Sequence, residues 1–290
     1  MNGFMHQKIL IFTDVDGSLL DHHSYSYSAA EPLLEDLRTA DVPVIPVTSK
    51  TRAELQVLRT ELQNRHPFIV ENGAAVFIPK ACFPELVGNA DTVDDLFCYA
   101  FSESRAYWQA LLKELETEFE HLFTTFEKAG VKGIMEMTGL SRAAAERANQ
   151  RDFSEPVSWL GDEKSKQAFI AAVEARGATV LQGGRFLHIT GGCDKGKAVQ
   201  WLCQQYQDHY AGLDLLTLAA GDSHNDIAML EVVDKPIIIR SPIQTIPTLK
   251  HRDVYITNKY GPEGWVEAVS KLIAPTISCP PSNNSLLGND

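Results

Sequence analysis

The chain has 290 residues, 44% of them hydrophobic, and a formal net charge of −12 at pH 7. This length allows one or two domains at roughly 150 residues per domain, the acidic balance argues against nucleic-acid binding, and no apolar stretch is long enough to span a membrane. Five cysteines without C-x-x-C spacing and a start without a signal-peptide core predict a reduced, soluble, cytoplasmic protein, whose oligomeric state the sequence leaves open.

The first predicted strand covers residues 9–12 and delivers two aspartates, Asp14 and Asp16, to its carboxyl end. Its unbroken apolar run suits a strand that is buried on both faces of a parallel sheet. Ligands of such sheets bind just beyond the carboxyl ends of the strands. One acid there could act as a nucleophile while the other exchanges a proton with the leaving oxygen. A strand-end turn held by Asp side chains is the alternative interpretation.

Two further strands follow, separated by helices. The polar residues 21–28, including two histidines, are expected to be solvated, and a helix is predicted over 29–40. The second strand, residues 42–47, contains Pro46, which favours an edge position or an early end of pairing. The third strand covers residues 68–70. This alternation is typical of a doubly wound, mostly parallel α/β sheet. Polar residues follow both strands: Thr48, Ser49 and Lys50 after the second, and Glu71, Asn72 and Gly73 after the third.

The pattern changes between residues 84 and 190, where charged helices alternate with strands. We interpret this segment as an inserted α+β domain. The chain then divides into core residues 1–83, the inserted domain at 84–190, core residues 191–274 and a tail at 275–290. Periodicity and capping residues predict helices over 102–122, 141–149 and 162–176, and strands over 157–160, 179–181 and 186–189.

The first pattern returns after the insertion. Lys195 lies at the start of a helix that ends near residue 206, and a strand over 213–220 follows. The loop after this strand carries three oxygen-bearing side chains, those of Asp222, Asn225 and Asp226. A strand over 236–239 and a helix over 264–273 are also predicted. The tail after them has too little apolar content to pack and is expected to be disordered.

Four polar clusters should therefore meet at one sheet edge: Asp14 with Asp16, Thr48 with Ser49 and Lys50, Lys195, and Asp222 with Asn225 and Asp226. Their carboxylates suit Mg²⁺, which would neutralise phosphate oxygens. Asp14 could attack phosphorus in line to give an aspartyl-phosphate, and Asp16 could protonate the leaving alcohol. The Thr48 hydroxyl and the Lys195 charge could bind the phosphate.

The segments DVDGSLL, VTSK, DKGKAV and GDSHND resemble, in order and spacing, the four motifs of the haloacid dehalogenase-like (HAD) phosphatases. The insertion resembles the type C2B cap of that superfamily. The resemblance implies a Rossmann-like core, a Mg²⁺ cofactor and a catalytic set with Asp14 as nucleophile, Asp16 as acid/base, Thr48 and Lys195. It implies that Asp222 and the backbone carbonyl of Asp16 bind the metal. The candidate metal-binding positions are therefore Asp14, Asp16, Asp222, Asn225 and Asp226.

More narrowly, VTSKTRAEL, VENGAAVFIP, TGLS before RDFSEP, GRFLHITGG and GPEGW resemble the mannosyl-3-phosphoglycerate phosphatase family. This implies hydrolysis of mannosyl-3-phosphoglycerate to phosphate and mannosylglycerate, a compatible solute. An Arg fork suits the glycerate carboxylate, while Glu, Asn and His suit sugar hydroxyls; for each cap residue, a surface salt bridge or helix cap is an equal alternative. The implied substrate-binding residues are Ser49, Lys50, Glu71, Asn72 and Gly73 in the core and Arg142, Arg151, Glu155, Arg185 and His188 in the cap.

Two alternatives stay open at this point. The same chemistry could act on glucosyl-3-phosphoglycerate or another sugar phosphate, because hexose epimers differ only in the orientation of one hydroxyl. A catalytically silent binding module on the same fold is the alternative of another class. It would be expected to lack Asp14, Asp16, Lys195 or Asp222, and all four are present.

Overall fold

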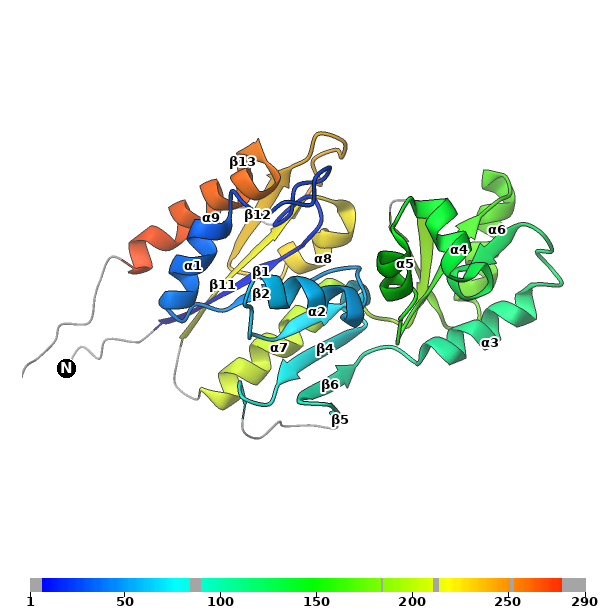
Figure 1. Cartoon of the computed structure of the whole chain (residues 1–290), viewed down its shortest axis with the longest axis horizontal. Coiled ribbons are helices and arrows are strands. Elements are labelled where there is room, and N and C mark those ends of the chain that lie inside the picture. The colour runs from blue at the N-terminus through cyan, green and yellow to red at the C-terminus, as the bar shows by residue number, and fades with distance from the viewer. Residues whose placement is uncertain (1–6, 84–89, 184, 211–213, 251–252, 278–290) are drawn as a thin grey trace, which may run out of the picture.

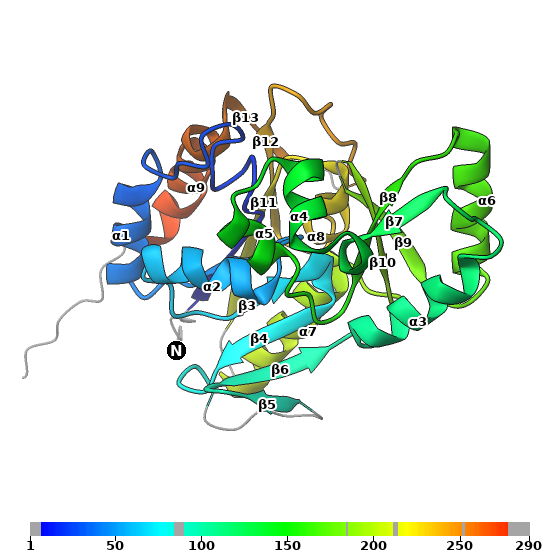
Figure 2. The same cartoon turned by 45° about the vertical axis from the view of Figure 1, so that its right-hand side comes forward.

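The structure, a computed structural model, shows a larger lobe built from both ends of the chain and a smaller lobe built from its middle (Figure 1). We call the larger lobe the core and the smaller lobe the cap. Figure 2 shows the cap helix α5 (Arg142–Ala148) beside the core helix α2 (Arg52–Glu61). The structure describes residues 7–83, 90–183, 185–210, 214–250 and 253–277.

The centre of the core is a five-stranded sheet in which all neighbouring strands are parallel. Strand β1 lies between β11 and β2, so its carboxyl end has a neighbouring strand on each side. Strand β2 is the terminal strand, which is the first of the two alternatives that Pro46 left open. Strand β13 was not predicted, because its polar sequence resembles a loop. The strands, in spatial order, are β13 (Tyr255–Tyr260), β12 (Lys235–Arg240), β11 (Asp214–Gly221), β1 (Gln7–Thr13) and β2 (Val44–Pro46).

Both faces of β1 are buried, which explains its continuous apolar sequence. Leu10 and Phe12 face a cluster that includes residues of α7 and α8, whereas Ile9 and Ile11 face residues of α1 and α9. Helices thus cover both faces, and the predicted doubly wound core is confirmed. The helices are α1 (Glu31–Thr39), α7 (Lys195–His209), α8 (Ile227–Leu230) and α9 (Gly261–Ile277).

The third predicted strand does not continue the parallel sheet. Its residues form β3, which pairs with β4 in antiparallel orientation and touches the central sheet through one bridge between Val47 and Ile69. The strand after β3 follows too closely for a crossover, so antiparallel pairing is the only geometry open to it. This second sheet has the order β3 (Phe68–Val70), β4 (Ala75–Pro79), β6 (Leu96–Ala100) and β5 (Asp91–Val93).

Residues 91–100 therefore lie in a sheet with core strands, although the sequence assigned them to the inserted domain. We propose that the cap begins after Ala100 rather than at residue 84, and that it ends near Thr190 as expected. The segments that join the two lobes are tied together at Ser102. Its hydroxyl accepts a hydrogen bond from the Gly191 N–H at 2.9 Å and donates to the Phe153 carbonyl at 2.8 Å.

The cap consists of a four-stranded antiparallel sheet with helices packed on it, around Trp108 and Phe169. The helix predicted over 102–122 is shorter and spans Arg105–Leu115. Residues 116–122 form turns that lead into β7, and among them His121 adopts a left-handed φ of 63°. The cap elements are α3 (Arg105–Leu115), β7 (Phe123–Thr125), α4 (Phe126–Thr138), α5, β8 (Glu155–Trp159), α6 (Glu163–Glu174), β9 (Thr179–Gly183) and β10 (Phe186–Thr190).

The end of the chain differs in part from the prediction. Helix α9 continues to Ile277, three residues into the segment that we expected to form a tail. The remainder of that predicted tail, residues 278–290, lies outside the described residues. In the part of the chain that is described, no helix combines the length and apolar character needed to cross a membrane.

Candidate active site

Three buried aspartates and a buried lysine meet at the carboxyl end of β1. The Lys195 ammonium, at the first turn of α7, donates to Asp14 Oδ1 and to Asp226 Oδ1, both at 2.6 Å. Asp226 also orders the loop after β11, since its Oδ2 accepts the Asp222 and Ser223 backbone N–H groups at 3.1 and 3.0 Å. The sheet topology thus assembles residues that are more than 200 positions apart in sequence.

The charges of this cluster perturb one another strongly. Burial raises the pKa of Asp14 well above its usual value, and Asp226 and Asp222 add to this effect while Lys195 opposes it. Burial also raises the pKa of Asp222 to about 6, again with a contribution from Asp226. For Lys195, burial acts to lower the pKa, but Asp14 and Asp226 outweigh it and raise the pKa. A pKa that is shifted by burial together with specific neighbouring charges is typical of a functional site.

The cluster fits a divalent cation. One carboxylate oxygen from each of Asp14, Asp222 and Asp226 lies within 4.8 Å of the others. Three carboxylates against one ammonium leave excess negative charge, and an oxygen-only donor set suits a hard cation. Gly17 allows the close approach of the chain, because it has a φ of 84° and a Cβ there would lie 2.5 Å from Asp222 Oδ2.

Asp16 and Thr48 follow the neighbouring parallel strands β1 and β2, at the same edge of the sheet as this cluster. Lys50 Nζ pairs with Asp16 Oδ2 at 2.9 Å, while Asp16 Oδ1 is buried and has no hydrogen-bond partner among the described residues. Thr48 is buried, and its hydroxyl accepts the Lys50 backbone N–H at 3.1 Å. An unpaired buried oxygen is costly unless a ligand or water satisfies it, so Asp16 Oδ1 is a candidate for contact with substrate.

The turn after β3 has a left-handed backbone over three consecutive residues, which is strained at the two that are not glycine. Glu71, Asn72 and Gly73 have φ values of 51°, 60° and 92°. A glycine is required at position 73 for two reasons. Its φ of 92° is unfavourable for other residues, and a Cβ there would clash with the Asp194 carbonyl oxygen at 2.2 Å. The turn brings Asn72 Oδ1 within 3.1 Å of Asn225 Nδ2, which donates to it. In this structure, Asn72 and Gly73 therefore position the active-site loops.

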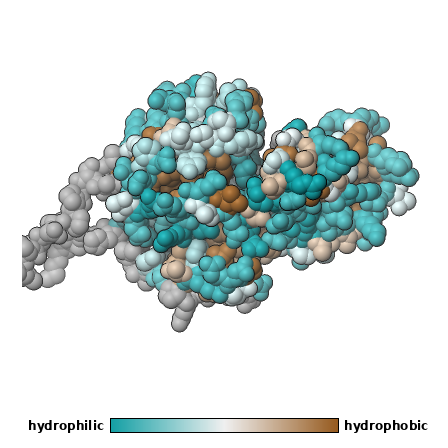
Figure 3. Space-filling model, viewed as in Figure 1, coloured by the Kyte–Doolittle hydropathy of each residue, from teal (hydrophilic) through white to brown (hydrophobic). Residues whose placement is uncertain are grey.

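A cavity of about 730 Å³ lies over the cluster, between core and cap. The space-filling view shows the molecule hollowed between the two lobes (Figure 3). A second hollow of about 800 Å³ near Arg59 contains none of the predicted site residues. Predicted residues that line the cavity between the lobes are Asp14, Asp16, Ser49, Lys50, Arg151, Arg185, His188, Asp222 and Asn225.

Two predicted cap residues lie outside the cavity lining. Glu155 is fully buried within the cap, where its carboxylate accepts hydrogen bonds from the Arg105 and Gln109 side chains and from the Glu127 N–H. Arg142 is exposed on α5 and pairs with Glu146 one turn away, at 3.7 Å. In this arrangement these two residues serve the cap itself, and neither contacts the space where a substrate would bind.

The cavity also has lining residues that the sequence did not single out. His22 and Tyr25 come from the polar segment after β1 that we expected to be solvated, and the Tyr25 ring lies 5.6 Å from Lys50 Nζ. Their position in a polar stretch directly after the strand that carries Asp14 was the sequence signal that could have identified them as lining residues. Further unpredicted lining residues are Glu54, Phe126, Thr138, Leu140, Ala148, Gln182, Phe186, Ser223, His224 and Gln244.

A family comparison now adds to this geometry. The sequence model of haloacid dehalogenase-like hydrolases matches residues 11–258 of the chain. The chain belongs to this family. A phosphatase of the HAD superfamily from Bacteroides thetaiotaomicron has a similar fold, with a TM-score of 0.64, 14% sequence identity and coverage of 94% of this chain and 98% of that one.

Two curated relatives carry the name glucosyl-3-phosphoglycerate/mannosyl-3-phosphoglycerate phosphatase. The protein from Methanococcoides burtonii is 36% identical over 92% of this chain and 97% of its own length. The protein from Persephonella marina is 34% identical over 91% of this chain and 97% of its own length. The predictions of a HAD-like fold and of an enzyme that hydrolyses phosphoric monoesters are confirmed.

Proposed function

We propose that the chain is a Mg²⁺-dependent phosphatase that hydrolyses mannosyl-3-phosphoglycerate to mannosylglycerate and phosphate. One observation carries this proposal: a buried Asp–Lys cluster lies beneath a cavity whose cap side presents Arg151, Arg185 and His188. The substrate class comes from the two curated relatives, whose name includes both the glucosyl and the mannosyl ester. We therefore propose glucosyl-3-phosphoglycerate as a second substrate of the same site, in a route to a compatible solute.

Asp14 is the proposed nucleophile. Its carboxylate oxygen forms a bond to phosphorus while the bond from phosphorus to the glycerate oxygen breaks, and Asp16 gives its proton to that oxygen. Water then attacks the aspartyl-phosphate, Asp16 takes the proton, and the bond between Asp14 and phosphorus breaks to release phosphate. Lys50 holds Asp16 Oδ2, whereas Oδ1 has no hydrogen-bond partner in the described part of the chain, so we assign these proton transfers to Oδ1.

Lys195 and Thr48 are proposed to assist this chemistry. The Lys195 ammonium fixes the Asp14 carboxylate through their 2.6 Å contact and supplies positive charge next to the incoming phosphate. Mg²⁺ held by Asp14, Asp222 and Asp226, with Asn225 and the Asp16 carbonyl as the further expected ligands, would neutralise phosphate oxygens. Thr48 is not among the residues that line the cavity; its proposed part is to hold the turn of Ser49 and Lys50, which do line it, through the hydrogen bond that its hydroxyl accepts from the Lys50 N–H.

The cap side is proposed to bind the rest of the substrate. Arg151 and Arg185 offer guanidinium groups to the glycerate carboxylate. His188 is buried, and burial, aided by Arg151, lowers its pKa to about 3, so the neutral imidazole offers a hydrogen bond to a sugar hydroxyl. Its Nδ1 has no partner among the described residues. The pairings of Glu155 and Arg142 within the cap argue against the substrate contacts expected for them.

The proposal is tested by phosphate release from a panel of esters, each with Mg²⁺ and with EDTA. The panel contains mannosyl- and glucosyl-3-phosphoglycerate, mannose 6-phosphate, sucrose 6-phosphate and 3-phosphoglycerate. We expect the highest kcat/KM on the two glycosyl esters and loss of activity in EDTA. Equal activity over simple sugar phosphates would remove the proposed substrate, and activity that is indifferent to EDTA would remove the metal.

A further inference from the structure

The Glu71 carboxylate joins the core to one segment of the cap. Its Oε1 accepts the Asp152 backbone N–H at 2.9 Å. Its Oε2 accepts the Phe153 N–H at 3.3 Å and the Ser154 hydroxyl at 2.5 Å, and lies 3.4 Å from Arg151 Nε. Both oxygens thus accept hydrogen bonds from residues 151–154, and the side chain has no exposed surface, so the substrate contact expected for Glu71 is not open to it in this arrangement.

These contacts are made in a site that excludes water. The Glu71 side chain has no exposed surface and that of Arg151 is 4% exposed. A buried carboxylate is strongly unfavourable unless charges and hydrogen bonds replace its hydration. Among the described residues, this replacement comes from cap residues 151–154. Separation of this segment from the core would remove all four contacts together. The closed arrangement of the lobes is therefore coupled to the charge of Glu71.

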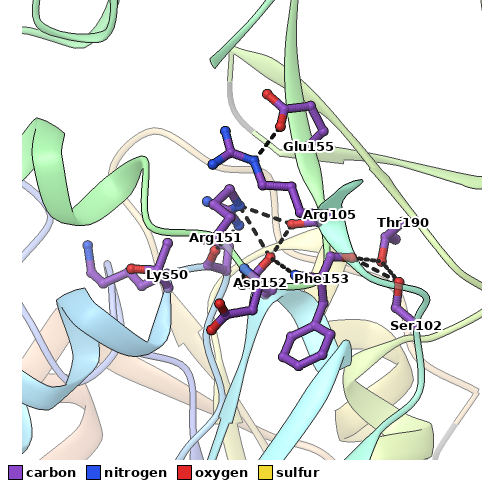
Figure 4. A network of polar contacts seen from close by, with 12 residues as sticks. Lys50, Ser102, Arg105, Arg151, Asp152, Phe153, Glu155 and Thr190 are labelled. Carbon is purple, nitrogen blue, oxygen red and sulfur yellow. Dashed lines mark hydrogen bonds and ion pairs between the residues drawn. The ribbon is translucent and has the colours of Figure 1, made fainter. Parts of the chain in front are cut away.

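Arg151 is held between the two lobes by the same network. Its Nη2 donates to the Ser49 carbonyl at 2.8 Å, and its Nε donates to the Ser154 hydroxyl, which in turn donates to Glu71. Figure 4 shows Arg151 and Asp152 between Lys50 of the core and the Ser102–Thr190 pair. Arg151 also lines the cavity together with Ser49 and His188. The guanidinium is thereby anchored at the edge of the substrate space.

The strained turn fixes the position of Glu71 relative to the catalytic loops. The Glu71 N–H donates to the Lys50 carbonyl at 3.0 Å, and the Asn72 N–H donates to the Thr48 carbonyl at 2.9 Å. Backbone strain of this kind persists only where surrounding contacts determine the conformation, and it concentrates at functional sites. The turn thus presents Glu71 to the cap and Asn72 to the loop of Asn225.

We infer that Glu71 is a positioning residue: its carboxylate holds residues 151–154 against the core, so that Arg151 is placed to bind the carboxylate of an anionic phosphate ester. The inference rests on the proposed function for the identity of that ester. It assigns Glu71 a role in substrate affinity through Arg151, without contact to the substrate.

The test compares wild type with Glu71→Gln, which keeps the shape of the side chain and removes its charge. We expect KM for mannosyl-3-phosphoglycerate to rise about tenfold or more, with a smaller change in kcat. p-Nitrophenyl phosphate has no carboxylate for Arg151, so its kcat/KM should fall less. Ser154→Ala, which removes one donor but no charge, should raise KM in the same direction by a smaller factor and serves if Glu71→Gln does not fold.

Hydrogen exchange of the free protein supplies a readout that needs no substrate. The amides of Asp152 and Phe153 should exchange faster in Glu71→Gln than in wild type, because their acceptor is weakened. Arg52→Gln is the matched control, since it removes an ion pair to Asp152 at the same junction (3.6 Å) without touching Arg151. This control should leave both KM and the exchange rates near the wild-type values.

The outcomes separate the inference from the proposed function. Unchanged KM or unchanged exchange in folded Glu71→Gln would overturn the positioning role, as would equal losses on both esters. If wild type hydrolyses p-nitrophenyl phosphate but neither glycosyl ester, the proposed function fails. The positioning role is then decided by the exchange rates alone.

Discussion

Core and cap both bury an ion pair, but they use it differently. In the core, Lys195 contacts Asp14 and Asp226 beneath the cavity, and an excess of negative charge remains for a cation. In the cap, Arg105 neutralises Glu155, which is further satisfied by two hydrogen bonds and is excluded from the cavity. A buried charged cluster that keeps an excess of one sign suggests a catalytic or metal-binding role. A buried charge that is fully neutralised and hydrogen-bonded suggests a structural role.

The largest expected contrast comes from breaking the two pairs. Lys195→Ala and Arg105→Ala each leave a buried carboxylate without its cation, so each should lower the free energy of unfolding by about 3–5 kcal/mol. Activity should separate them: Lys195→Ala should lower kcat by at least about a hundredfold, whereas Arg105→Ala should stay active at temperatures where it is folded. Denaturant titrations and phosphate release measure the two effects. Equal loss of kcat in the folded variants would contradict the distinction.

Packing of the cap is tested separately from its charges. Phe169 is fully buried at the centre of the cap cluster, so Phe169→Ala should cost about 3–5 kcal/mol in unfolding free energy. Leu160 is a control in the same lobe, since it is 62% exposed and its replacement by Ala should cost less than about 0.5 kcal/mol. Urea titration of both variants measures this; similar midpoints would show that the cap core does not support the fold.

The pH dependence of stability probes the cap side of the cavity. The pKa of His188 is about 3 in the folded chain, mainly through burial, against about 6.5 when unfolded. Between these values only the unfolded chain binds the proton, so stability is complete above pH 6.5 and falls as pH decreases, by up to about 1.4 kcal/mol per pH unit. His188→Gln should remove this contribution, and exposed His23→Gln should not. Parallel pH–stability curves for wild type and His188→Gln would refute the buried neutral imidazole.

The smallest effect is expected at Arg142. Its pair with Glu146 is a surface contact within one helix, worth about 0.3–0.5 kcal/mol. Arg142→Ala should therefore leave KM for the glycosyl ester within about twofold, whereas Arg151→Ala should raise it by about tenfold or more. Steady-state kinetics of the two variants make this comparison. A large KM increase in Arg142→Ala would mean that α5 reaches the substrate in another arrangement of the lobes.

The difference between the core site and the buried pair of the cap also explains which site residues could be predicted from the sequence. Asp14, Lys195 and Asp222 follow or precede buried elements of one parallel sheet, and the ends of such strands must converge, so local patterns were sufficient. Asp226 could be included because it shares the loop of Asp222. The mostly parallel, doubly wound sheet was predicted from the alternation of apolar runs and amphipathic helices, and the inserted domain from the point where this alternation changes; the order of the strands was not predicted.

The remaining positions depend on tertiary pairing that no local pattern records. Glu71 and Glu155 have the residue type expected for sugar recognition, but the groups that donate hydrogen bonds to them lie up to 83 positions away in the sequence. Only the packing of those distant elements decides whether either carboxylate is open to a substrate. The strands β4 and β6 were missed because a short antiparallel ladder needs only brief apolar runs. Tyr25 enters the cavity through a left-handed φ of 55°, which its residue type does not predict.

The central claim is that the core performs phosphoryl transfer through Asp14, and phosphate release by Asp14→Asn tests it most directly. Asn keeps the size of the side chain but removes the attacking carboxylate, so kcat on mannosyl-3-phosphoglycerate and on p-nitrophenyl phosphate should both fall by at least about a thousandfold. Circular dichroism should show an intact fold. Retention of wild-type kcat on either ester by folded Asp14→Asn would contradict the account.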